Sequence, residues 1–182
     1  GQLLTSDSDF LSVIDTNLSG NKANYWVTRQ TAHTIDVDRN GDLKATTTVT
    51  WRNDSPGDSW PGGEYINYVR VYVPKGSVVT DVTPQLDDYT VGEMFGYTEV
   101  AGVIKVSPQE DKTLTVTYVL PRDLNVSTSS TYELLWQPQP GILDEQVVFT
   151  FNVPGFLSTS DAASVTRRIQ WPFRINLAFS AK

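Results

Sequence analysis

The chain has 182 residues, of which 39% are hydrophobic and 11% aromatic, a composition that favours one folded domain over a disordered segment. Fourteen basic and 21 acidic residues give a formal charge of −7, which argues against non-specific binding to nucleic acid or anionic lipid. The sequence contains no cysteine, and this excludes disulfides, thiolate zinc sites and cysteine nucleophiles.

The first structural element that the sequence predicts is a helix over residues 7–18, with Ser6 or Asp7 as its N-cap. Its apolar side chains fall at helical spacing, at Phe10, Leu11, Val13, Ile14 and Leu18. We therefore expect residues 1–24 to form a helical lead-in or linker, and residues 25–182 to form the main domain.

Beyond residue 25 the pattern changes to alternation, which is typical of strands with one buried face. The segments 114–120, 147–153 and 173–179 each place an apolar side chain at every second position. Turn residues separate these segments. The sequence thus predicts an all-β fold, an antiparallel, immunoglobulin-like β-sandwich of about nine or ten strands with one short N-terminal helix.

Residues 35–45 read IDVDRNGDLKA, a spacing of acidic residues that suits either a calcium loop or a hairpin turn. A calcium loop of the EF-hand type needs a carboxylate at its twelfth position, where this chain has Thr47. A three-residue turn at 39–41, with Gly41 in the left-handed conformation, instead places Asp36 opposite Lys44. We favour the hairpin; the alternative is a calcium site formed by Asp38, Asn40 and Asp42.

The sequence offers little support for catalysis. His33 is the only histidine, and strand parity directs it toward the packed face, where a structural role is expected. Serine-hydrolase, phosphate-loop and zinc-protease motifs are all missing from the sequence. A carboxylate pair is not excluded, although Asp87 and Asp88 favour a surface turn. We expect a non-enzyme with no catalytic residues, no cofactor and no resident metal.

The loop of residues 53–65 holds the best candidates for binding. Trp60 lies between glycines and prolines, with Asp58, Glu64 and Tyr65 nearby. An exposed tryptophan beside polar groups is a common stacking surface for sugars. We nevertheless favour the interpretation that Trp60 folds back and closes one end of the sandwich, and keep the sugar-stacking surface as the alternative.

Several motifs, occurring in order between about residue 10 and residue 155, resemble one bacterial family. They comprise Asn17, Leu18, Lys22, Asn24 and Tyr25, then the turn 60–63, the strand 67–74 and the Gln-Pro-Gly at 139–141. This set is similar to the C-terminal part of the family called domain of unknown function 4012. The resemblance implies a large cell-envelope protein, anchored by a membrane helix outside this segment, and a location outside the membrane. It implies no activity and no catalytic residues.

These observations lead to two expectations about function. The first is an extracytoplasmic structural or interaction module of a surface-anchored bacterial protein, whose partner is another surface protein or a glycan. The alternative is a carbohydrate-binding module that recognises glycans of the envelope or the environment through its loop aromatics. Nucleic acid is not expected as a partner because the chain is acidic.

Overall fold

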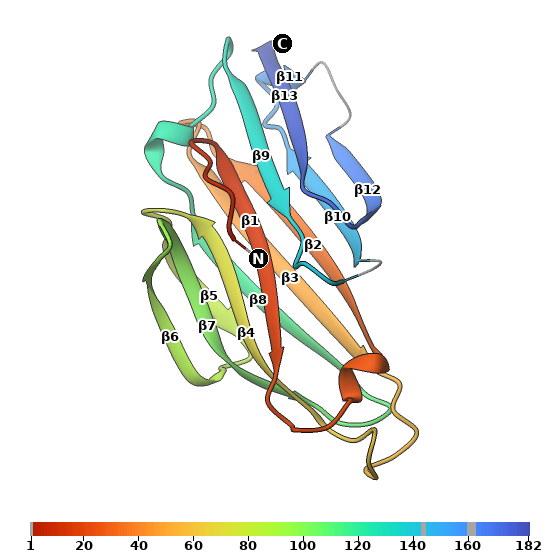
Figure 1. Ribbon diagram of the computed structural model, residues 1–182. Coiled ribbons are helices and arrows are strands. Elements are labelled where there is room, and N and C mark those ends of the chain that lie inside the picture. The colour runs from red at the N-terminus through yellow and green to blue at the C-terminus, as the bar shows by residue number, and fades with distance from the viewer. Residues whose placement is uncertain (1, 143–144, 160–162) are drawn as a thin grey trace.

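Two β-sheets form the body of the computed structural model, which describes residues 2–142, 145–159 and 163–182 (Figure 1). The first sheet has the order β11 (Leu157–Thr159), β13 (Phe173–Ala181), β9 (Thr131–Gln137), β1 (Asp9–Asn17), β4 (Tyr65–Pro74), β7 (Tyr97–Val106) and β6 (Asp87–Met94). The second has the order β12 (Ser164–Ile169), β10 (Glu145–Asn152), β2 (Val27–Val37), β3 (Leu43–Asn53), β8 (Asp111–Val119) and β5 (Val78–Thr83). The predicted all-β class is confirmed.

The finer details of that prediction differ from the structure. Within the described ranges there are 13 strands, where nine or ten were expected. The sheets are mixed and not purely antiparallel, because β1 runs parallel to β9 and β2 runs parallel to β10. The only helical turns in the described part of the chain are the short 3-10 segments η1 (Ala23–Tyr25) and η2 (Arg122–Leu124). No helix among the described residues is long and apolar enough to span a membrane.

The helix predicted over residues 7–18 is wrong, because residues 9–17 form β1, an inner strand of the first sheet. Leu11 and Val13 face the main core, while Phe10 packs on the outer face against Tyr72 and Tyr97. The N-terminal residues cover that outer face, where the Leu4 carbonyl accepts a hydrogen bond from the Tyr97 hydroxyl. A strand buried on both faces has no polar alternation, so its apolar run resembled a helix.

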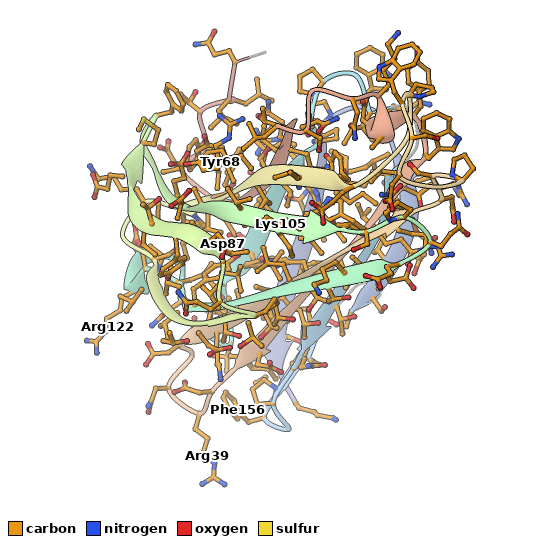
Figure 2. The ribbon with its side chains drawn as sticks, turned by 90° about the horizontal axis from the view of Figure 1, so that it is seen from below. Arg39, Tyr68, Asp87, Lys105, Arg122 and Phe156 are labelled. Atoms are coloured by element: carbon orange, nitrogen blue, oxygen red, sulfur yellow. The ribbon has the colours of Figure 1, made fainter. Side chains whose placement is uncertain are left out.

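The hairpin at residues 35–45 forms as predicted. Asp36 pairs with Lys44 and Val37 with Leu43, and Gly41 has a φ of 85°. Figure 2 shows Arg39 at the tip of this turn, pointing away from the sheets. Ile35, Leu43, Ala45, Val49 and Trp51 are all buried on the inner face, as the parity argument requires. The stretch is therefore a turn between β2 and β3.

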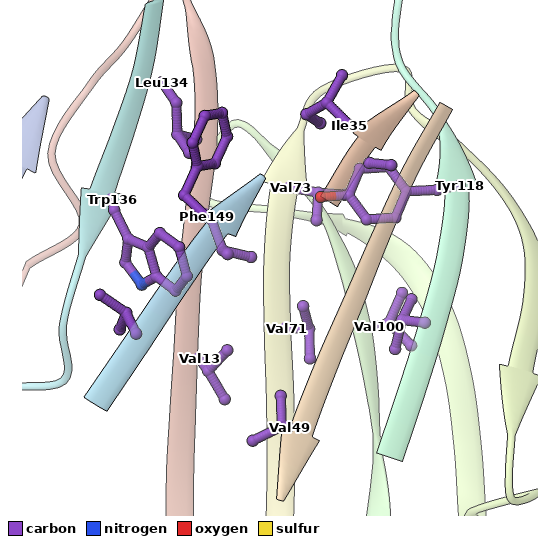
Figure 3. Packing of buried hydrophobic residues seen from close by; sticks show 14 of the residues in the cluster. Val13, Ile35, Val49, Val71, Val73, Val100, Tyr118, Leu134, Trp136 and Phe149 are labelled. Carbon is purple, nitrogen blue, oxygen red and sulfur yellow. The ribbon is translucent and has the colours of Figure 1, made fainter. Parts of the chain in front are cut away.

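Side chains from both sheets interdigitate to form the core (Figure 3). Val13, Val71, Leu134 and Trp136 come from the first sheet, and Ile35, Val49, Tyr118 and Phe149 come from the second. The large buried rings fill the space between the layers, and burial of such rings supplies much of the stability of a two-layer fold. Trp51 and Trp136 are buried in this core, whereas Trp171 is exposed in the turn between β12 and β13.

We predict that Gly41→Ala destabilises the protein more than Gly96→Ala. The two glycines have nearly the same φ, 85° and 84°, so each alanine carries a left-handed strain of about 1–2 kcal/mol. A Cβ on residue 41 would also lie 2.2 Å from the Val126 carbonyl oxygen, whereas nothing lies within 4 Å of one on residue 96. This overpacking adds about 1–3 kcal/mol at residue 41 alone. Urea unfolding of both variants measures the difference; equal losses would contradict the prediction.

Candidate functional site

A cleft of about 740 Å³ opens between the two sheets, at the end where β1 finishes and β2 begins. Three separate parts of the chain form its wall: the segment that includes η1, the start of β4 and the segment that follows β9. We call it the end cleft, and the lining residues on which its chemistry depends are Asp15, Asn24, Tyr25, Arg29, Tyr65 and Gln139. Its volume lies within the range of small-ligand pockets.

Three charged residues form an ion triad at the base of the end cleft. Arg29 donates through Nη1 to Asp15 Oδ2 at 2.8 Å. On its other side it donates through Nε and Nη2 to the two carboxylate oxygens of Glu145, at 3.1 and 2.8 Å. Asp15 belongs to the first sheet and Arg29 to the second, so this guanidinium ties the layers together.

The two carboxylates of the triad also accept hydrogen bonds from neighbouring side chains. Asn67 Nδ2 donates to Asp15 Oδ1 at 2.8 Å, and the Trp51 indole donates to Asp15 Oδ2 at 3.1 Å. Thr31 donates its hydroxyl to Glu145 at 2.6 Å. A buried ion pair is tolerated when its geometry is good and further hydrogen bonds complete it, and both conditions hold for this triad.

The triad also sets the ionisation of its neighbours. Burial lowers the pKa of Arg29, but Asp15 and Glu145 more than offset this, and the net pKa lies above its ordinary value. Burial also raises the pKa of Tyr65, and the negative charge of Asp15 adds to this effect. The end cleft thus contains a permanent but compensated cation and a neutral phenol.

Gln139 holds one wall of the end cleft in place. Its side-chain carbonyl accepts the Asp15 N–H at 2.7 Å, and its amide donates to the Asp15 carbonyl at 3.0 Å. The Gln139 side chain therefore makes the two hydrogen bonds to the Asp15 backbone that a neighbouring strand would otherwise make. This fixes the position of Pro140 and Gly141, which also line the cleft.

The four residues predicted to bind are placed in different environments. Trp60 is 73% exposed and Asp58 is exposed, both in the loop between β3 and β4. Glu64 is half-buried, and its backbone carbonyl accepts hydrogen bonds from Ser19 and Asn21. Tyr65 is buried at the start of β4 and lines the end cleft. Trp60 does not fold back to close the end of the sandwich.

The Trp60 loop is attached to the segment that lines the end cleft. The Lys22 N–H donates to the Pro61 carbonyl at 2.9 Å, and Lys22 Nζ lies 6.0 Å from the centre of the Trp60 ring. Such a cation–ring contact at an exposed site contributes on the order of 0.5–1 kcal/mol. Trp60 and the end cleft therefore belong to the same end of the molecule.

His33 lies in the sealed core, together with Asp9, Thr47, Tyr118 and Tyr132. Its Nδ1 is 2.9 Å from the Thr47 hydroxyl and its Nε2 is 4.0 Å from Asp9 Oδ2, while Tyr132 donates its hydroxyl to Asp9. All five side chains are buried between the sheets. A substrate has no access to this histidine, so its expected structural role agrees with its position.

The acidic candidates have structural partners. Asp38 Oδ1 accepts the N–H groups of Asn40 and Asp42, at 2.7 and 2.9 Å, and so stabilises the hairpin turn. Asp87 on β6 pairs with Lys105 on the neighbouring strand β7 at 3.2 Å; Figure 2 labels both residues. Within the described ranges no group of three or more His, Cys, Asp or Glu residues is arranged to hold a metal ion. We therefore retain the turn interpretation for residues 38–42.

Sequence reasoning missed the ion triad and most of the end cleft. Arg29 has the same strand parity as His33 and Ile35, so its inward direction was available from the pattern. A buried arginine needs a partner, and that requirement would have predicted a buried carboxylate. The sequence pattern did not identify Asp15 and Glu145 as the partners of Arg29, and Glu145 is far from Arg29 in sequence.

Comparison with known proteins supports the fold alone. No protein-family model matches the sequence, and no curated protein matches it. A solved structure from Legionella pneumophila, titled "putative nutrient binding protein", is similar with a TM-score of 0.53 and 10% identity; the match covers 94% of this chain and 71% of that one. An M1 zinc metallopeptidase from Deinococcus radiodurans matches with a TM-score of 0.31 and 12% identity, over 85% of this chain and 38% of that one. The second similarity is too low to carry an argument.

We predict that Arg29→Met destabilises the protein by about 3–5 kcal/mol at pH 7, because Asp15 and Glu145 are then left buried without their cation. Arg52→Met is the matched control. Arg52 also contacts two carboxylates, Asp54 and Asp111, but its side chain is 38% exposed, against 4% for Arg29. Urea unfolding should show little change for the control. A similarly small loss for Arg29→Met would contradict a stabilising triad.

We predict that stability falls as the pH rises above about 10. Burial, with a further contribution from Asp9, raises the pKa of Tyr118 and Tyr132 in the folded state, while their unfolded value stays near 10. The unfolded chain therefore releases these protons first, and each alkaline step favours unfolding. Tyr118→Phe should reduce the loss of unfolding free energy between pH 9 and pH 11 by about 1 kcal/mol. Tyr25→Phe, at an exposed position, should not change it.

Proposed function

We propose that this chain is an interaction module of a surface-anchored bacterial protein, carried outside the membrane. The observation behind this proposal is the end of the molecule that holds the end cleft, where Tyr25 is 80% exposed and Trp60 is 73% exposed. Large rings exposed beside a polar cleft are typical of recognition surfaces.

The location outside the membrane rests on the resemblance to the cell-envelope family described above. Two of the motifs that carry the resemblance contribute residues to the end cleft: the first gives Asn17, Asn24 and Tyr25, and the last gives Gln139 to Gly141. Motifs distant in sequence but close in space suit a shared function, so this clustering supports the resemblance. The anchor of the parent protein and the identity of the surface partner remain part of the proposal.

A non-catalytic role is part of the same proposal, with no cofactor and no resident metal. It is supported by the burial of His33 and by the pairing of the carboxylate at the cleft base. Asp15 is held by Arg29, Asn67 and Trp51, which leaves it poorly placed to transfer a proton.

The second candidate function is carbohydrate binding by the Trp60 loop. The exposure of Trp60 favours it, because a free indole face can stack on a sugar ring. Tyr65 does not extend this surface as expected, because it is buried in the end cleft.

We also retain the immunoglobulin-like class as a proposal about the fold. Two facing sheets with an aromatic core support it. The extra strands and the two parallel pairs are departures from its simplest form.

The proposal predicts that the purified chain co-sediments with isolated bacterial envelopes, and that Trp60→Ala reduces the bound fraction several-fold. Phe95→Ala is the matched control, since Phe95 is also 73% exposed but lies in the β6–β7 turn at the other end of β4. Both variants should keep the wild-type melting temperature. Failure of the wild type to sediment, or equal losses in the two variants, would show that this end is not the interaction surface.

A further inference from the structure

Tyr65 leaves a polar atom without a protein partner in the wall of the end cleft. The residue is only 4% exposed, and its hydroxyl makes no hydrogen bond with any of the described residues. The hydroxyl is not among the fully buried polar atoms, so it is accessible from the cleft. A phenol held neutral by its surroundings can both donate and accept a hydrogen bond. This group is therefore suited to a ligand in the cleft.

The rim of the end cleft supplies a ring and an amide. Tyr25 has one ring contact among the described residues, an edge contact with Trp26 at 6.4 Å, so its faces are open for stacking. Asn24 is exposed, and its side chain makes no hydrogen bond within the described part of the chain. An amide offers both donors and an acceptor. The free groups of the cleft thus include a ring face, a phenol and a carboxamide.

The charges in the end cleft do not favour an ionic ligand. Arg29 is engaged by Asp15 and Glu145, and Asp15 accepts hydrogen bonds on both of its oxygens. An anion would need a free cation, and a cation would need a free carboxylate. The described lining offers neither, so a neutral ligand fits best.

The ligand class follows from the free side chains of the end cleft and not from its strand edges. At the cleft the pairing of β1 with β9 has ended at Ser12, that of β2 with β10 begins only at Gln30, and the Gln139 side chain occupies the N–H and carbonyl of Asp15. The ring, phenol and amide suit a neutral molecule with many hydroxyl groups and an apolar C–H face.

We propose that the end cleft binds a neutral saccharide. The Tyr25 ring stacks on the C–H face of a sugar unit, while the Tyr65 hydroxyl and the Asn24 amide exchange hydrogen bonds with its hydroxyl or acetamido groups. This inference rests on the interaction function proposed above and names its ligand class. It places the sugar unit itself in the cleft, while the neighbouring Trp60 contacts other parts of the larger envelope partner.

The test uses the whole chain and three neutral hexasaccharides, namely β-1,4-linked N-acetylglucosamine, β-1,4-linked glucose and mannose. Calorimetric titration should detect binding of at least one of them. Tyr65→Phe should weaken that binding about tenfold, the value of one lost hydrogen bond. It should leave the melting temperature unchanged, because the hydroxyl has no protein partner to lose. Tyr25→Ala should abolish detectable binding. Tyr68→Phe, on the same strand as Tyr65 but outside the cleft lining, is the matched control and should bind as the wild type does.

Nuclear magnetic resonance of the tryptophan indoles locates the ligand. The Trp51 indole donates to Asp15 at the base of the cleft, so its signal should shift, while the Trp60 signal should not. A shift of Trp60 alone would overturn the cleft proposal and favour the loop. A shift of Trp51 with inorganic phosphate would overturn the choice of a neutral ligand.

The outcome also separates this inference from the function on which it rests. Sedimentation with envelopes, combined with no binding of any of the three sugars, would overturn the saccharide proposal and leave an interaction module with another partner. Loss of both sedimentation and sugar binding would overturn both.

Discussion

The arrangement of this molecule at its loop-rich end depends on one guanidinium group. Arg29 reaches from the second sheet to Asp15 on the first, while it also holds Glu145 on the neighbouring strand β10. Removing these three charges from water is costly, and only complete pairing offsets that cost. The positions of β1, β2 and β10 are therefore fixed relative to one another at this end. A binding surface formed by residues on these strands is rigid for the same reason.

The same pairing decides the character of the end cleft. The triad holds one cation and two carboxylates, so it keeps a net negative charge, but each of its three groups is engaged by another member. The groups left for recognition include a ring, a phenol and an amide. Binding sites of this kind select by shape and hydrogen-bond direction more than by charge.

The sequence allowed much of the second sheet to be predicted, because its strands bury one face only. Parity placed Ile35 and Trp51 inward, and the pairing of Asp36 with Lys44 followed from the turn length. The parity argument failed for β1, because both faces of this strand are covered and its side chains do not alternate between apolar and polar. The end cleft was also beyond prediction, because it joins Tyr25, Tyr65 and Gln139, whose proximity depends on long-range strand order. Of the predicted binding residues only Tyr65 lines it.

The two parallel strand pairs have a consequence for how the chain reaches its native state. β1 lies between β4 and β9, and β2 lies between β3 and β10, so each sheet needs strands from the last third of the chain to be complete. Such a topology has a high contact order, and domains rich in distant pairings fold in milliseconds to seconds. During synthesis the first strands leave the ribosome long before β9 and β10 do, and their open edges are exposed to aggregation in that interval. A protein of this design benefits from chaperone protection until its C-terminal strands arrive.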